Sequence, residues 1–172
     1  MKKILLLFCT VLVSVTASAR YYDSEPDAGD WAIGLNMNSG SYYPLINFGL
    51  GTKLQYYATS AFRIEANFNW FIERKNVKNW DTNLNLHYTF PIVENLRVYP
   101  VVGANLMYGH HKRTRFCPGL NAGGGLQYNV AERVYVAAEA VYKYSSTKSL
   151  DNNDDYFLGP RAELTVSVAY RF

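Results

Sequence analysis

The alternation of apolar and polar residues along most of the chain constrains its fold more than any other feature. It is clearest over residues 62–70. There the apolar side chains are Phe62, Ile64, Ala66, Phe68 and Trp70, and the polar ones between them are Arg63, Glu65, Asn67 and Asn69. A helix would scatter the apolar residues around its axis, whereas a strand places all of them on one face. The segment therefore predicts a β-strand with one apolar and one polar face.

Seven further segments show the same period of two. They are residues 31–38, 45–56, 80–90, 96–108, 120–129, 134–144 and 160–172. Most are close to the length of about 9–11 residues that a tilted strand needs to cross a membrane. Bacterial single-chain membrane barrels have an even number of strands, which eight satisfies. The predicted fold class is all-β, an eight-stranded antiparallel up-and-down transmembrane β-barrel.

The connections between these segments alternate in length. The short ones are residues 57–60, 91–95 and 130–133, and the longer ones are residues 39–44, 71–79, 109–119 and 145–159. Membrane barrels have tight periplasmic turns and longer extracellular loops. The alternation therefore places both chain termini in the periplasm.

The first residues have the three parts of a secretory signal peptide. Met1-Lys2-Lys3 is basic, residues 4–15 are mostly apolar, and Ala17-Ser18-Ala19 is a small-residue cleavage site. The apolar run is shorter than the roughly 20 residues of a spanning helix. We expect a signal peptide over residues 1–19, a short periplasmic segment over residues 20–30 and the barrel over residues 31–172.

Alternation alone does not tell which face is the interior, because a soluble eight-stranded barrel turns its apolar face inward. Here the polar face is rich in Gly and Asn and carries few charges, unlike a sheet that faces water. Aromatic residues make up 16% of the chain, and many end the apolar faces, as in the interfacial girdles of membrane barrels. These features favour the membrane orientation. Without Lys2 and Lys3 the charges nearly balance, which argues against a nucleic-acid partner.

The last strand has the most specific pattern, Val166-Ser167-Val168-Ala169-Tyr170-Arg171-Phe172. With the rest of the mature chain, it resembles the small outer-membrane barrels, the OmpA-like transmembrane domains and OmpX-like proteins of the porin-family group. The resemblance implies a place in the cell outer membrane of a Gram-negative bacterium, with contact to outer-membrane lipid and lipopolysaccharide. It also implies an assembly signal at Tyr170 and Phe172, read by the barrel-assembly machinery. The alternative is an ordinary strand that closes the barrel.

The polar face carries charged residues that a narrow lumen has to bury. They are Lys53, Arg63, Arg97, Lys143, Arg161, Arg171, Glu65, Asp81, Glu139 and Glu163. Unpaired ions would cost several kcal/mol each, so we expect a paired luminal polar network. Its predicted members are Lys53, Arg63, Glu65, Arg97, Glu139, Lys143, Arg161 and Glu163, with Arg161 beside Glu139. Glycines on the same face, among them Gly125, leave room for Tyr99, Tyr135 and the arginine stems. The network either fills the barrel or acts as a gate or proton path.

The third long connection carries a basic cluster. Its residues are His110, His111, Lys112, Arg113 and Arg115. Clustered basic residues attract anions, so this loop is a candidate for contact with lipopolysaccharide phosphates, and a merely solvated loop is the alternative. Adjacent histidines point apart in a strand, which argues against a metal site. We expect no metal, no cofactor and no catalytic residues.

Two enzyme families share this architecture, and the chain departs from both. Pro26 and the acidic residues of the segment 20–30 do not suit the leading amphipathic helix of the palmitoyl-transferring barrel. The lipid A deacylase needs a Ser two residues after its His, where this chain has Arg113 after His111. The predicted role is therefore non-enzymatic, structural or in surface interaction through extracellular loops. A narrow channel for small solutes is the alternative, and a lipid A-modifying enzyme is the third possibility.

Overall fold

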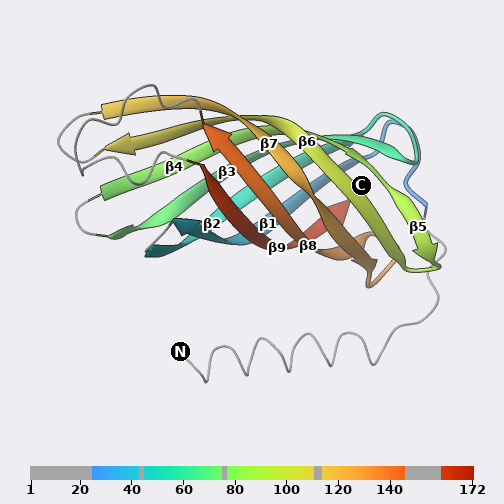
Figure 1. The fold of residues 1–172 in the computed structure, drawn as a ribbon. Coiled ribbons are helices and arrows are strands. Elements are labelled where there is room, and N and C mark those ends of the chain that lie inside the picture. Colours follow the sequence, from blue (N-terminus) through green and yellow to red (C-terminus); the bar gives the residue numbers. More distant parts are fainter. Residues whose placement is uncertain (1–24, 43–44, 75–76, 111–113, 146–159) are drawn as a thin grey trace, which may run out of the picture.

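Antiparallel strands close into a barrel in the computed structural model, which describes residues 25–42, 45–74, 77–110, 114–145 and 160–172 (Figure 1). The strands are β1 (Trp31–Tyr42), β2 (Leu45–Tyr57), β3 (Phe62–Arg74), β4 (Val77–Tyr88), β5 (Phe90–Val93), β6 (Leu96–His110), β7 (Thr114–Asn129), β8 (Val134–Ser145) and β9 (Arg161–Arg171). Strands that follow one another in the chain pair with each other, except β4 and β5, which both pair with β6. The β1–β9 pairing joins the first and last strands, and the β4–β6 pairing completes the ring.

The strand β5 continues the line of β4, so the wall has eight strands. The break between them is at Thr89, whose backbone N–H donates to the Ala61 carbonyl oxygen at 2.7 Å. Both β4 and β5 pair with β6. The predicted eight-stranded antiparallel up-and-down barrel is confirmed. No helix among the described residues is long and apolar enough to cross a membrane.

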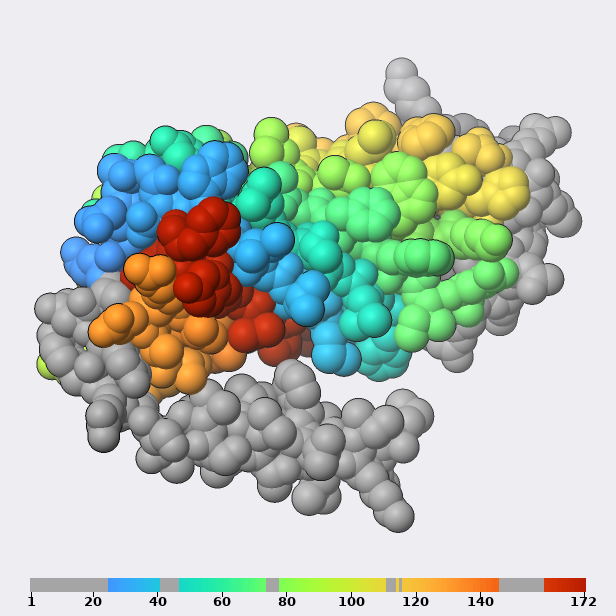
Figure 2. All heavy atoms as spheres, turned by 180° about the vertical axis from the view of Figure 1, so that it is seen from behind, coloured from blue at the N-terminus to red at the C-terminus, as the bar shows by residue number. Residues whose placement is uncertain are grey.

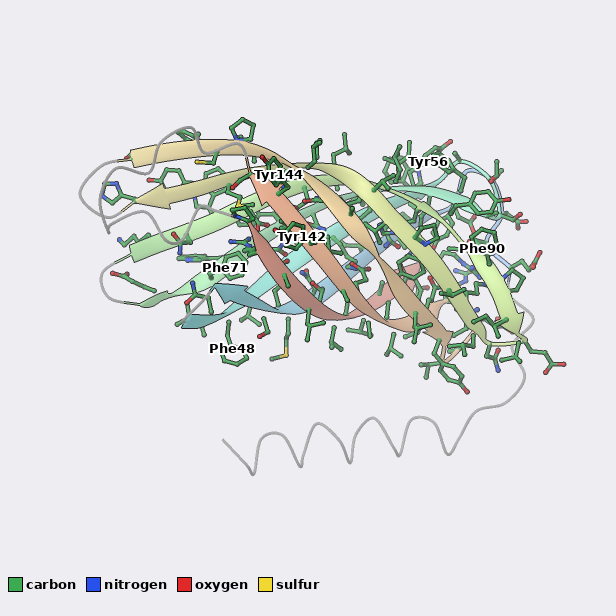
Figure 3. All side chains as sticks on the ribbon, viewed as in Figure 1. Phe48, Tyr56, Phe71, Phe90, Tyr142 and Tyr144 are labelled. Atoms are coloured by element: carbon green, nitrogen blue, oxygen red, sulfur yellow. The ribbon has the colours of Figure 1, made fainter. Side chains whose placement is uncertain are left out.

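The predicted strand phase is also confirmed, because side chains of the apolar face point outward. Trp70 is 66% exposed, whereas its polar neighbours on β3 point inward and Arg63 is 0% exposed. The outward aromatic residues lie toward both ends of the barrel. Figure 3 shows Tyr56 and Phe90 toward the end with the short turns, and Phe48 toward the other end. We call these the turn end and the loop end. Figure 2 shows the outer face over β1, β2 and β9 as a continuous layer of side chains.

Several strands are longer than the sequence pattern predicts. The predicted connection 109–119 is mostly strand, since β6 reaches His110 and β7 begins at Thr114. The connection 71–79 is likewise mostly strand, and the first part of 91–95 is β5. In these outer parts polar residues such as Lys78 and Thr114 occupy the outward phase, so the hydrophobic alternation that marks a membrane strand fades there. Of the connection 145–159, only Ser145 is among the described residues.

These longer strands make the loop end uneven. The β7–β8 pairing stops at Gly119 and Ser145, while β6 and β7 stay paired out to His110 and Thr114. The β2–β3 pairing stops at Phe71, while β3 and β4 stay paired out to Arg74. The outer parts of β3, β4, β6 and β7 therefore project beyond the rest of the wall, as the left side of Figure 1 shows. We call them the projecting sheet.

The N-terminal segment lies across the turn end. Gly29, with a φ of 99°, donates to the carbonyl oxygen of Tyr57 at 2.8 Å, and Tyr57 donates to that of Asp30 at 2.9 Å. Asp30 also lies 3.5 Å from Arg171, and Glu25 lies 3.5 Å from Arg97. Pro26 between them is buried. The segment therefore covers part of this mouth of the lumen. The predicted signal peptide lies outside the described residues.

Candidate functional site in the barrel lumen

The candidate site is the lumen, where the structure places all eight residues of the predicted polar network. Each has a buried side chain that points into the barrel. They fall into two groups along the barrel axis. The turn-end cluster is Lys53, Arg63, Glu65 and Glu139, and the loop-end cluster is Lys143, Arg161 and Glu163 together with Asp81. Arg97 lies nearer the turn-end mouth, beside Glu25.

Lys53 is the centre of the turn-end cluster. Its Nζ donates to Glu139 Oε1 at 2.9 Å and lies 3.2 Å from Glu65 Oε2. The amide of Gln55 donates to Glu65 at 2.6 Å, and the Tyr99 hydroxyl donates to Glu139 at 2.9 Å. Both carboxylates therefore have a cation and neutral donors, which offsets the desolvation of the ions.

Arg63 completes this cluster without a direct carboxylate partner among the described contacts. Its Nε donates to His87 Nδ1 at 2.8 Å, and its Nη1 donates to Gln127 Oε1 at 2.5 Å. Its Cζ lies 4.4 Å from the ring centroid of Tyr99, a cation–π distance, and Tyr99 stacks on His87. The turn-end cluster therefore holds two cations and two carboxylates, with no net charge.

Asp81 is the centre of the loop-end cluster. Lys143 Nζ lies 3.0 Å from Asp81 Oδ2 and 2.8 Å from Glu163 Oε1. Arg161 contacts Asp81 and lies 3.2 Å from Glu163, and its Cζ is 4.6 Å from the ring centroid of Phe71. The predicted neighbour of Arg161, Glu139, is instead bound by Lys53 in the other cluster. This cluster is neutral as well.

A belt of asparagines separates the two clusters. Its members are Asn36, Asn38, Asn67, Asn69, Asn83, Asn85, Asn105 and Asn121. Representative bonds run from Asn36 Nδ2 to Asn69 Oδ1 at 2.7 Å, from Asn83 Nδ2 to Asn67 Oδ1 at 2.6 Å and from Asn121 Nδ2 to Asn85 Oδ1 at 2.8 Å. The sequence shows these amides on the polar face, but their mutual bonds follow only from the register between strands.

The belt also reaches both clusters. Asn67 donates to Glu65 at 2.9 Å, while Asn69 and Asn83 donate to Asp81 at 2.8 and 2.7 Å. Charged and uncharged side chains thus form one hydrogen-bonded filling over the length of the lumen.

Glycines give this filling its room. A Cβ at Gly125 would lie 2.6 Å from the Tyr99 ring, so the predicted space for Tyr99 is confirmed. Gly51 and Gly103 make room for asparagines instead, since a Cβ there would overlap the Oδ1 atoms of Asn69 and Asn85. Near the loop end, Phe71, Met107 and Cys117 are buried, with Met107 directly opposite Cys117. The lumen is therefore filled with side chains along its length and at its loop end.

The barrel has an apolar outward face, a lumen filled with polar side chains and a closed ring of strands, as membrane barrels have. The chain matches the family model described as the outer membrane protein beta-barrel domain over residues 5–172. It belongs to that family. Like the structurally similar proteins, this outer-membrane barrel lies in the bacterial outer membrane, in contact with its lipid.

Solved structures share the fold of this outer-membrane barrel at low sequence identity. The N-terminal β-barrel domain of Pseudomonas aeruginosa OprF is 16% identical, with a TM-score of 0.63, and the match covers 82% of this chain and 97% of the OprF domain. Neisserial surface protein A is 16% identical, with a TM-score of 0.64, over 83% of this chain and 96% of its own. Ail, the attachment invasion locus protein of Yersinia pestis, is 17% identical, with a TM-score of 0.56, and the match covers 84% of this chain and 99% of Ail. No curated protein matches.

The predicted surface residues of this outer-membrane barrel are only partly described. His110 is the exposed last residue of β6, and its Nδ1 lies 2.9 Å from Thr114 Oγ1. His111, Lys112 and Arg113 lie outside the described residues, and Arg115 lies in β7 opposite Gly109. No group of three or more His, Cys, Asp or Glu side chains that could hold a metal ion occurs in the part of the chain that the structure describes.

The predicted assembly residues lie at the turn end. Tyr170 and Phe172 are outward-facing residues, 45% and 60% exposed. Phe172 exchanges backbone hydrogen bonds with Trp31, at 2.9 and 3.2 Å, and so joins the last strand to the first. These contacts fit barrel closure, and a role in assembly stays a prediction.

Proposed function

We propose that this protein is a closed, non-enzymatic outer-membrane barrel that acts by contacts at its loop end. The packed lumen carries this proposal. Two neutral ionic clusters, a hydrogen-bonded asparagine belt and the N-terminal segment together occupy the space through which a solute would pass. An eight-stranded barrel has an interior just wide enough for its own side chains.

We further propose that the loop end is extracellular and the chain termini are periplasmic. The short connections lie at the same end of the barrel as its first and last residues, which is the periplasmic end in membrane barrels. The assembly machinery would then read Tyr170 and Phe172 from the periplasmic side. The basic stretch of His110, His111, Lys112, Arg113 and Arg115 would face the medium, where it is suited to anionic saccharides. One structure of the similar protein Ail is a complex with the heparin analogue sucrose octasulfate.

Planar-bilayer conductance of the refolded protein tests the closed lumen. We expect no steady conductance under conditions in which a wide porin, added to the same bilayer, conducts. Regular single-channel steps from this protein would favour the alternative, a narrow channel. The lipid A composition of cells with and without the protein tests for enzymatic activity, and we expect no difference.

Binding to immobilised heparin tests the surface role. Replacement of Lys112, Arg113 and Arg115 by Ala should weaken retention and lower its salt dependence, because each lost cation removes an attraction to sulfate groups. The matched control is Arg133→Ala, which removes an exposed cation of the turn end. Equal retention of all variants would contradict a role of this stretch in anion binding.

A further inference from the structure

One row of aromatic side chains crosses the outer face of the projecting sheet. Trp70, Trp80, Tyr108 and Phe116 occupy paired positions on β3, β4, β6 and β7. The rings of Trp80 and Tyr108 stack with centroids 4.9 Å apart and planes 12° apart, and Phe116 packs edge-on against Tyr108 at 5.2 Å. Phe68 adjoins Trp80 from the row below at 5.7 Å. The result is an aromatic platform on the outward-facing surface.

A polar row lies directly above this platform, toward the loop end. Lys78, His110 and Thr114 are paired with one another across β4, β6 and β7, each two residues beyond Trp80, Tyr108 or Phe116. Two residues of a strand span about 6.6 Å, so the two rows are adjacent. All three side chains are exposed and share the outward phase of the aromatic row. Figure 2 shows side chains of β3, β4 and β6, green to yellow, side by side at this end.

The polar row can bind an anion. Within the described part of the chain, Lys78 has no ion pair with an acidic side chain, and the nearby exposed acid, Glu73, lies in the bulge of the β3–β4 pairing between Phe71 and Arg74. The exposed His110 contacts Thr114 through its Nδ1 atom, and its Nε2 atom has no hydrogen bond with another described residue. On the described parts of β1, β8 and β9, outward side chains near the loop end, such as Met37, Tyr144 and Leu164, are uncharged. Among the described residues, the combination of cation and platform lies over β4, β6 and β7.

We propose that this surface, the rim site, binds a phosphorylated and acylated glycolipid of the outer leaflet. The rim site consists of Lys78, His110 and Thr114 above Trp80, Tyr108 and Phe116. Lys78 and His110 would bind a sugar phosphate through charge-assisted and neutral hydrogen bonds. The platform would support the acyl chains at the depth where aromatic side chains settle in membranes.

The width of the site favours a glycolipid over a single phospholipid headgroup. The row spans β4, β6 and β7, which are two interstrand spacings or about 10 Å. That width suits an acylated disaccharide, the lipid A part of lipopolysaccharide, whose phosphate and several acyl chains leave the sugar in different directions. The inference rests on the proposed extracellular position of the loop end, because lipid A occupies the outer leaflet.

Binding of diphosphoryl lipid A to the folded protein in phosphatidylcholine nanodiscs tests the rim site. Tryptophan fluorescence and native mass spectrometry report the bound lipid. The parallel ligands are lipid A without phosphates and phosphatidylglycerol, and inorganic phosphate is the competitor. The variants are Lys78→Ala/His110→Ala and Trp80→Leu. Arg133→Ala and Trp31→Leu, at the turn end, are the matched controls. Heat-modifiable mobility on gels checks that each variant is folded.

We expect Lys78→Ala/His110→Ala to bind lipid A roughly 10-fold more weakly, as the loss of a charge-assisted hydrogen bond requires. Wild-type protein should lose a similar factor for lipid A without phosphates, and the double variant should lose no more. Trp80→Leu should weaken binding of both lipids, and the controls should bind as wild type. Inorganic phosphate should compete only weakly.

Equal binding by wild type and the double variant, or equal loss in Arg133→Ala, would overturn the rim site. Equal affinity for phosphatidylglycerol would replace the glycolipid by any anionic lipid and overturn the proposal as stated. Bilayer conductance reports separately on the closed lumen. Biotin labelling of a Lys78→Cys variant on intact cells, in a Cys117→Ser background, reports on the extracellular position.

Discussion

Replacement of Lys53 by Met tests whether the lumen depends on its charge balance. Lys53 Nζ lies 2.9 Å from Glu139 and 3.2 Å from Glu65, and the three side chains are at most 4% exposed. At an effective dielectric constant of about 20, each pair has a gross attraction of about 5 kcal/mol, most of which offsets desolvation. Met keeps the length of the side chain but leaves the two buried carboxylates with Arg63 as the one remaining cation of the cluster, which contacts neither of them directly. Removal of one partner from a buried pair costs about 3–5 kcal/mol, and we expect a loss of stability of that size.

The double variant Lys53→Met/Glu139→Gln is the matched control. It removes one charge of each sign and leaves Arg63 and Glu65, so the cluster is neutral again. We expect it to be at least about 2 kcal/mol more stable than Lys53→Met alone.

Urea unfolding in detergent micelles, followed by tryptophan fluorescence and by gel mobility of unboiled samples, measures both changes. A loss below about 1 kcal/mol for Lys53→Met would refute the reasoning, because ordinary surface ion pairs are worth that much. A double variant as unstable as the sum of its single changes would refute charge balance as the cause.

Three further predictions concern particular positions. Gly123→Ala should lower the yield of folded barrel, because its Cβ would overlap the Ala140 carbonyl oxygen. Gly124→Ala should fold normally, because the one atom within 4 Å of its Cβ is 3.2 Å away. Heat-modifiable mobility on gels measures the folded yield of both variants. Cys117 is 8% exposed, so a maleimide should label the folded protein far more slowly than the urea-unfolded one, and equal rates would mean that the lumen opens freely. Phe172→Ala should reduce assembly in cells but leave refolding in micelles intact. Tyr144→Ala, which changes a similarly exposed aromatic residue of the loop end, should leave both assembly and refolding unchanged. Equal assembly of both variants would contradict the assembly role.

The strand phase could be predicted because each strand has lipid on one side and packed polar groups on the other. Alternation puts Arg63, Glu65 and Asn69 on one face of β3, the composition of the two faces predicts that this face points inward, and all three residues are buried. The ends of the strands could not be predicted in the same way. Residues 114–119 fall within the predicted connection 109–119, where the alternation fades, yet they pair with β6.

The partners within the lumen were the harder part. Arg161 and Glu139 lie on adjacent strands and on the same face, which made them plausible neighbours. The register places Arg161 opposite Lys143, and Glu139 opposite Thr165, so Glu139 is a full layer nearer the turn end. Asp81, which binds Arg161 and Lys143, comes from the opposite wall. Contacts across a lumen depend on strand tilt and stagger, and alternation within single strands contains neither.

The asparagine belt has a consequence for how the lumen can be rebuilt. Along β8, Glu139 of one cluster and Lys143 of the other are four residues apart, or about 13 Å. The amides between them carry no charge, but Asn67 donates to Glu65, and Asn83 donates both to Asn67 and to Asp81. Substitutions in one hydrogen-bonded network usually do not have additive effects. A water-filled passage would therefore require the two clusters and the belt to be redesigned together.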